Sequence, residues 1–157
     1  MLFTGSAWAQ RPVLEGAASA GSGASFGSGD GQTVVLMTPV YMDVDVIFYN
    51  DESPKLEYVI GFQAELQGRV SAGIVPQLRL TNGPEKWMVY GLVGVPFVVA
   101  PFMMLGVEAG GGLLWRFMPR FGVFAEVVLD LFFIGNDLPD DGMLAQLDAN
   151  IGFRVSF

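Results

Sequence analysis

The stretch DANIGFRVSF, residues 148–157, alternates between apolar and polar side chains and ends on a phenylalanine. Its apolar positions are Ala149, Ile151, Phe153, Val155 and Phe157, and the other positions are Asp148, Asn150, Gly152, Arg154 and Ser156. A period of two places successive side chains on opposite faces of a β-strand, so one face meets an apolar medium and the other a polar medium. The stretch predicts a strand, but it does not decide which medium meets which face.

The same alternation recurs along most of the chain. It is found in residues 33–49, 56–67, 69–81, 102–118, 121–134 and 143–157, and in all six segments the charges stay opposite the apolar face. Residues 12–26, rich in Gly, Ala and Ser, form either a poor first strand or a flexible lead-in, and residues 87–98 are apolar on both faces. With both counted, eight antiparallel strands joined by short turns rich in Gly, Asn, Asp and Pro predict an all-β, up-and-down β-barrel.

A rival interpretation concerns residues 87–107, a run of twenty-one residues without a charge. A run of about 18 or more such residues normally predicts a transmembrane helix. Pro96, Pro101 and several glycines oppose a helix here, the neighbouring segments alternate, and no cluster of Lys or Arg flanks the run. We expect strands, and a helical membrane protein is the alternative.

The charge content indicates which face of the barrel meets lipid. Only 15% of the residues are charged and 52% are hydrophobic, whereas a soluble domain carries about 25% charged residues. A soluble, lipocalin-like carrier needs a charged exterior, yet the polar face of each strand holds only a few ionisable groups. Aromatic residues gather near the segment ends, as in the interfacial girdles of membrane barrels: Phe48, Tyr49, Trp87, Phe97, Trp115, Phe117, Phe121, Phe133 and Phe157. We predict an eight-stranded antiparallel transmembrane β-barrel with a packed polar interior, and a soluble carrier is the alternative.

Composition also restricts the possible functions. The chain has no His and no Cys, which excludes Ser-His-Asp catalysis, Cys-based catalysis and the usual zinc sites. The net charge of -8 and the pI near 4.2 argue against nucleic acid, whose phosphates need a Lys/Arg surface. The acidic segment 136–142 lacks the spacing of an EF-hand, and we interpret it as a solvated turn. We expect no enzyme, no cofactor and no metal centre.

The first residues of the chain look like part of a secretory signal. Ala7-Trp8-Ala9 before Gln10 has the small-x-small form of a signal-peptidase site. We interpret residues 1–9 as the remnant of a signal peptide and residues 10–157 as a single β-barrel domain. With both termini in the periplasm, turns near residues 50, 82 and 118 would face the periplasm, and turns near residues 30, 68, 100 and 137 would face outward.

A three-residue turn at 118–120 would fix the register of the two strands that it joins. The expected pairs are Phe117 with Phe121 on the outside, and Gly112 with Glu126 and Glu108 with Asp130 on the inside. We expect Glu126 to pair diagonally with Arg154, with Gly112 and Gly152 making room for the side chains.

The polar faces of the strands place ionisable side chains in the interior of the barrel. We predict an ionic network there that comprises Glu108, Arg116, Glu126, Asp130, Asp148 and Arg154. Two carboxylates as close as Glu108 and Asp130 should share a proton, or recruit an arginine or a cation. Perturbed carboxylates can mark catalysis, but a network that holds the strands in register is the simpler hypothesis.

The last strand resembles a known signal. An alternating strand that ends in Phe, here Ile151, Phe153, Val155 and Phe157, resembles the C-terminal signature of bacterial outer-membrane β-barrel proteins, which the barrel-assembly machinery recognises. The stretch from Gly106 to Phe133 is similar to the paired strands of small barrels of the outer-membrane protein A and X type.

This resemblance implies a monomeric barrel in the outer membrane of a Gram-negative bacterium. Its partners would be the surrounding lipid and, during insertion, the assembly machinery. It would have a structural or interaction role in the cell envelope rather than that of a general porin. A narrow channel, or a small-ligand binder that uses the acidic lumen, is the alternative.

Overall fold

The structure, a computed structural model, describes residues 13–29, 32–49, 55–66, 71–136, 138 and 142–157. They form the strand segments β1 (Val13–Gly29), β2 (Gln32–Met37), β3 (Tyr41–Tyr49), β4 (Lys55–Glu65), β5 (Ala72–Asn82), β6 (Trp87–Gly94), β7 (Phe97–Ala100), β8 (Met104–Met118), β9 (Phe121–Gly135) and β10 (Met143–Ser156). Within the described ranges there is no helix long and apolar enough to cross a membrane. The predicted signal remnant at residues 1–9 and most of the acidic segment 136–142 lie outside the described residues.

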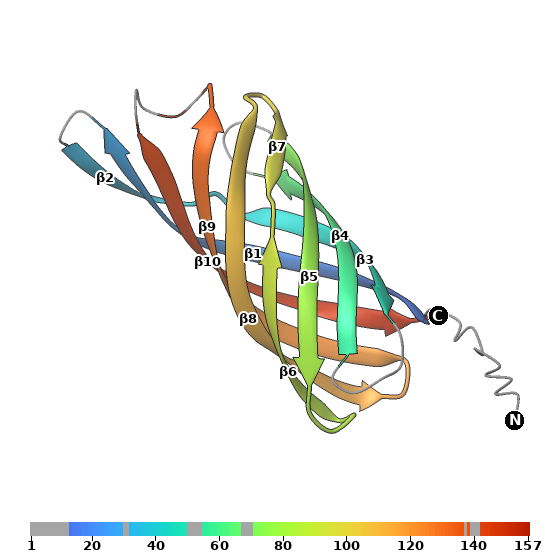
Figure 1. The fold of residues 1–157 in the computed structure, drawn as a ribbon. Coiled ribbons are helices and arrows are strands. Elements are labelled where there is room, and N and C mark those ends of the chain that lie inside the picture. The colour runs from blue at the N-terminus through green and yellow to red at the C-terminus, as the bar shows by residue number, and fades with distance from the viewer. Residues whose placement is uncertain (1–12, 30–31, 50–54, 67–70, 137, 139–141) are drawn as a thin grey trace, which may run out of the picture.

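The segments form one closed antiparallel sheet of eight strands (Figure 1). β2 and β3 are two pieces of one strand, because both pair with β1, and β6 and β7 are likewise one strand between β5 and β8. β1 pairs with β10 from Glu15 opposite Ser156 to Ser28 opposite Met143, and this pairing closes the barrel. The predicted all-β, eight-stranded, up-and-down barrel is therefore confirmed, and residues 12–26 contribute most of a regular first strand.

Two of the expected strands are interrupted next to a proline. The segment 33–49 divides at residues 38–40, around Pro39, and the segment 87–98 divides at Val95 and Pro96. Proline has no N–H to donate to a β-ladder, so the ladder breaks locally. Residues 87–107 lie in β6, β7 and the start of β8, so the helical alternative for this uncharged run is wrong.

The paired positions shift along the strands from one strand to the next around the barrel. Starting at Glu15, the successive partners are Ile47, Val59, Gln77, Gly94, Glu108, Asp130, Gln146 and finally Ser25, which lies ten residues farther along β1. Such a stagger tilts the strands by roughly 35–45° from the barrel axis. An eight-stranded barrel has an interior that is only just wide enough for side chains to fill. Side chains from opposite walls can therefore contact one another across the lumen.

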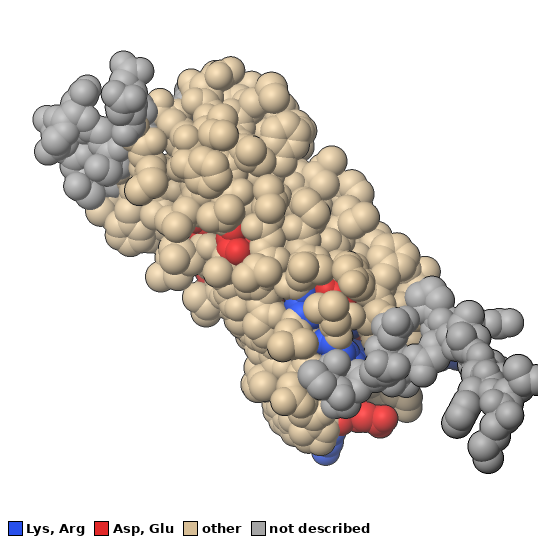
Figure 2. Space-filling model, viewed as in Figure 1, with Lys and Arg blue, Asp and Glu red and all other residues tan. Residues whose placement is uncertain are grey.

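The alternating side chains sort by face. On β9, Val127 is 52% exposed while the neighbouring Glu126 is 7% exposed, and the same alternation runs along β3, β4, β5 and β6. On the face that Figure 2 shows, most of the surface belongs to uncharged residues, and charged atoms appear only in a few small patches. An apolar surface of this extent is stable in lipid and not in water. A transmembrane barrel with its polar face inward is therefore confirmed, and the soluble-carrier alternative is wrong.

Aromatic side chains gather outside the barrel where β6 begins and β8 ends. The rings of Trp87 and Trp115 stack with their centroids 5.4 Å apart, and the Phe117 ring lies 5.9 Å from that of Trp115. Exposed aromatic rings at a strand end are typical of the membrane–water interface. Tyr49 does not belong to this set, contrary to the prediction, because its ring is buried in the lumen and its hydroxyl donates to Glu15.

The turn between β8 and β9 is shorter than predicted. Met118 faces Phe121, so the expected pairing of Phe117 with Phe121 is wrong, and Phe117 lies in a β-bulge. The extra residue in the bulge compensates for the residue that is missing from the turn. For this reason the interior register is as predicted, with Gly112 opposite Glu126 and Glu108 opposite Asp130.

An apolar cluster fills part of the lumen, which is therefore less polar than predicted. Its members are Ala17, Ile47, Tyr49, Val59, Met88, Tyr90, Leu92, Leu114, Phe124 and Val128. Met88, Tyr90 and Leu92 all come from β6, which explains why the segment 87–98 is apolar on both of its faces. The interior combines this apolar packing with buried charge, and the charges are arranged in distinct groups.

Candidate functional site in the barrel interior

Arg154 is the centre of an ion cluster at the end of the lumen near the termini of the described barrel, Val13 and Phe157. Its Nη1 and Nη2 atoms donate to the two carboxylate oxygens of Glu57, each at 2.9 Å. This bidentate geometry matches the planar guanidinium group. The Nε atom of Arg154 donates to Glu15, and the three side chains are at most 3% exposed. The cluster is therefore shielded from solvent.

Glu15 collects further hydrogen bonds in the same cluster. Arg116 Nη2 donates to its two oxygens at 2.7 and 3.0 Å, the Tyr49 hydroxyl donates at 2.7 Å, and the Ser156 hydroxyl also donates. Closure of the barrel explains this convergence, because β1 pairs with β10 and places Glu15 directly opposite Ser156. The first and last strands thus bring Glu15 close to Arg154 and Ser156. Tyr49, Glu57 and Arg116 reach the cluster from β3, β4 and β8.

Glu126 is not part of the Arg154 cluster, so the predicted diagonal pair is wrong. Glu126 accepts hydrogen bonds from the Tyr90 hydroxyl at 2.8 Å and from Asn150 Nδ2 at 3.0 Å. The space beside the two glycines is taken by aromatic rings, because a Cβ atom at Gly112 would meet Tyr90 and one at Gly152 would meet Phe124. Arg154 instead finds its acidic partners on the neighbouring strand β1 and, across the lumen, on β4.

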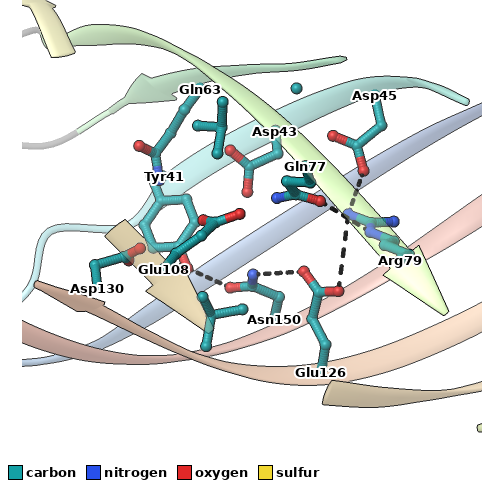
Figure 3. A pocket seen from close by; sticks show the side chains of 13 residues that line it. Tyr41, Asp43, Asp45, Gln63, Gln77, Arg79, Glu108, Glu126, Asp130 and Asn150 are labelled. Atoms are coloured by element: carbon teal, nitrogen blue, oxygen red, sulfur yellow. Dashed lines mark hydrogen bonds and ion pairs between the residues drawn. The ribbon is translucent and has the colours of Figure 1, made fainter. Parts of the chain in front are cut away.

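A second group lies around Arg79, in the middle of the lumen (Figure 3). Arg79 Nη2 lies 2.9 Å from Asp45 Oδ2 and 4.0 Å from Glu126 Oε2, and Arg79 Nε donates to Gln77 at 2.9 Å. The Tyr41 hydroxyl donates to Asn150, which in turn donates to Glu126. The central carboxylates therefore have both a cation and neutral donors as partners.

A third group, in the half of the lumen away from the termini, consists of carboxylates. Glu108 faces Asp130 across β8 and β9, and Glu108 Oε1 and Asp130 Oδ1 are buried without a hydrogen-bond partner. Asp43 accepts a hydrogen bond from Ser19 at 3.4 Å, and Asp148 accepts one from Thr38 at 2.9 Å. The ion pairs among the described residues include none of these four carboxylates.

Two cavities accompany these groups. One of about 30 Å³ lies among Asp43, Glu108, Asp130 and Arg79, and Figure 3 shows their side chains around it. The other, of about 570 Å³, lies at the end of the lumen near the termini, and its lining includes Lys55, Lys86, Arg116, Glu15 and Met88. No group of three or more Asp or Glu side chains among the described residues converges closely enough to form a metal centre.

The six residues of the predicted network are spread over these three groups. Arg116 and Arg154 lie near the termini, Glu126 lies in the middle, and Glu108, Asp130 and Asp148 lie in the acidic half. The prediction did not include four residues that make the ion pairs, namely Glu15, Asp45, Glu57 and Arg79. Their parity already placed them in the interior, but the partner of each depends on pairing around the whole barrel.

The closed sheet, the apolar exterior and the side-chain-filled interior define a small transmembrane β-barrel with the fold of bacterial outer-membrane proteins. The structure is similar to that of Neisserial surface protein A, with a TM-score of 0.57 and 9% identity over 92% of this chain and 97% of that chain. It is also similar to a de novo designed transmembrane β-barrel, with a TM-score of 0.56 and 13% identity over 92% and 95% of the two chains.

A weaker likeness is to Ail, the attachment invasion locus protein of Yersinia pestis. Its TM-score is 0.47, with 16% identity over 90% of this chain and 98% of that chain. No protein-family model matches the sequence, and no curated protein matches it either. At these identities, Neisserial surface protein A and the designed barrel support the fold of the chain and nothing beyond it.

Proposed function

We propose that the protein is a monomeric structural barrel of the bacterial outer membrane, with an interior that stabilises the fold. The observation that carries this proposal is the combination of an apolar exterior with a lumen in which an apolar cluster and ion pairs pack against each other. A barrel of this kind contributes a rigid, lipid-embedded wall or an interaction surface to the cell envelope. The absence of His and Cys from the sequence supports a non-catalytic role.

Insertion into the membrane is tested by gel electrophoresis. The refolded protein, in detergent or lipid, is compared with and without boiling in SDS. A folded barrel keeps its hydrogen-bonded wall in SDS and runs at a different mobility from the boiled chain. Two identical bands, together with a folded state that persists without detergent, would contradict the proposal.

The packed lumen supports a role other than that of a general porin. The apolar cluster meets the Arg154 cluster at Tyr49 and extends along the interior to Val128, which lines the small cavity. The narrow channel or small-ligand binder remains the second candidate function, and the cavity beside Glu108 and Asp130 favours it. Planar-bilayer recordings separate the two, because the structural barrel should give no conductance steps and a cation conduit should give small, cation-selective ones.

The lipid-facing residues of the last strand support an assembly role. Ile151 is 70% exposed, Phe153 58% and Phe157 79%, so these side chains are accessible on the outside of the wall. We propose that Ile151, Phe153, Val155 and Phe157 form the signal that the barrel-assembly machinery recognises. Expression in cells with and without a depleted assembly machinery tests this role, because recognition predicts loss of membrane insertion only after depletion.

A further inference from the structure

We propose that the interior of the barrel binds a small monovalent cation between Glu108 and Asp130. Both residues face the cavity of about 30 Å³ in the acidic half of the lumen (Figure 3). The proposal depends on the closed barrel and goes beyond the structural role proposed above.

Two carboxylate oxygens at this position lack a partner. Glu108 Oε1 and Asp130 Oδ1 accept no hydrogen bond from a third described residue. The two carboxyl groups lie within hydrogen-bond reach of each other, and the residues are only 7% and 8% exposed. A buried charged oxygen without a partner is strongly unfavourable, so such atoms normally contact a donor, water or ion. Gly94 lies opposite Glu108, and a Cβ atom there would lie 2.8 Å from the Glu108 Cδ atom. The glycine therefore leaves the space that the Glu108 carboxylate occupies.

The charge around the cavity is not balanced by the described side chains. Its lining contains five carboxylates, those of Asp43, Asp45, Glu108, Glu126 and Asp130, and one cationic group, Arg79. Arg79 is already paired with Asp45 at 2.9 Å and lies 4.0 Å from Glu126. The carboxylates of Glu108 and Asp130 therefore create a negative potential that attracts a mobile cation.

The size and ligands of the cavity select the kind of cation. A space of about 30 Å³ holds a water molecule or a bare alkali ion and excludes organic cations. Tyr41, Gln63 and Gln77, whose side chains carry neutral oxygens, also line it, and hard cations prefer oxygen ligands. Calcium takes about six to eight oxygen ligands, and the described residues offer no cluster of three acidic side chains that could hold a metal ion. A single positive charge, such as sodium, fits this pair better.

The test compares sodium with a cation too large for the cavity. The refolded barrel in zwitterionic lipid is unfolded with urea in sodium chloride or in N-methylglucamine chloride at equal ionic strength. If sodium binds only the folded barrel, the unfolding equilibrium constant should fall about elevenfold when sodium is at about ten times its dissociation constant. Sodium-23 relaxation of the folded barrel gives a second measurement that does not depend on unfolding.

The variants separate this site from general charge effects. Glu108→Gln/Asp130→Asn should lose both the sodium-dependent stabilisation and the sodium-23 broadening. Asp148→Asn removes a carboxylate of the same half that does not line the cavity, and it should keep both. The proposal is overturned if the wild-type barrel behaves identically in the two salts, as a proton shared by the pair would predict. It is also overturned if the double variant responds to sodium like the wild type.

Discussion

The two halves of the lumen differ in how their buried charged side chains are paired. Near the termini, Arg154 and Arg116 are paired with Glu15 and Glu57 through short hydrogen bonds. In the other half, Glu108 and Asp130 face each other, and Arg79, the one cationic group that lines their cavity among the described residues, is paired with Asp45. In the first arrangement the carboxylates are neutralised by arginine side chains, whereas in the second they require a proton or an ion for neutralisation. A single interior therefore contains both a stabilising core and a potential binding site.

This difference predicts that removing a charge changes the free energy of unfolding in opposite directions in the two halves. Removing a cation near the termini leaves carboxylates buried alone, which destabilises the barrel. Removing a carboxylate from the acidic half relieves repulsion, which stabilises the barrel. The four substitutions below are ordered by the size of their expected effect.

The largest effect is expected for Arg154→Met. The substitution leaves Glu57 and part of Glu15 buried without their guanidinium partner, and breaking such a pair costs about 3–5 kcal/mol. Urea titration of the refolded barrel, followed by tryptophan fluorescence, measures the loss. Arg116→Met is the matched control, because its side chain is 13% exposed and Arg154 remains to pair with Glu15, so its loss should be smaller. Equal and small losses would show that the cluster does not stabilise the fold.

The packing between the two halves is tested by Gly112→Ala. A Cβ atom at this position would lie 2.5 Å from the Tyr90 hydroxyl and 2.7 Å from the carbonyl oxygen of Ala125, so the Tyr90 ring must move away from Glu126. Overpacking of this kind costs about 1–3 kcal/mol. Gly91→Ala is the control, because that position faces outward and its nearest contact would be an ordinary 3.9 Å. The same urea titration should show a loss only for Gly112→Ala, and similar losses would mean that the lumen is loosely packed.

Glu108→Gln is expected to stabilise the barrel in a sodium-free buffer at neutral pH, unlike the two substitutions above. The substitution removes one of two facing carboxylates and should raise the free energy of unfolding by about 1 kcal/mol, within the usual range for a buried unsatisfied group. Glu57→Gln, which removes a carboxylate from the Arg154 cluster, should instead destabilise the barrel. If both variants shift the urea midpoint in the same direction, the contrast between the halves does not exist.

The smallest effect on stability is expected for Phe157→Ala. Phe157 is 79% exposed, and its backbone N–H donates to the Leu14 carbonyl at 3.2 Å, a bond that the substitution keeps. The ring follows the last residue of β10, at the end of the wall, so its removal should lower the free energy of unfolding by less than about 1 kcal/mol. The yield of inserted barrel in cells should nevertheless fall strongly if this residue belongs to the assembly signal. A wild-type yield would contradict that role and leave the comparison of the two halves unaffected.

The local arrangement of the barrel could be predicted because each strand carries its own pattern. The alternation in DANIGFRVSF assigns Ile151 and Phe153 to lipid and Asn150 and Arg154 to the interior, and the structure has them there. Pro39 and Pro96 lie where the hydrogen bonding of a strand is interrupted, but the alternation of side chains alone did not predict these interruptions. The bulge at Phe117 changes the turn without changing the interior pairs, so a wrong turn length still gives a correct register.

The sequence by itself determined the strands, the face of each residue and, through the low charge content, the membrane environment. These properties follow from a period of two and from the cost of exposing apolar surface to water. Only the tertiary structure decided that Arg154 meets Glu15 and Glu57 instead of Glu126. Contacts across a lumen depend on the stagger of all eight strands and on the closure of β1 against β10. Neither is encoded in any one segment of the chain, because each pairing adds its own shift to the next.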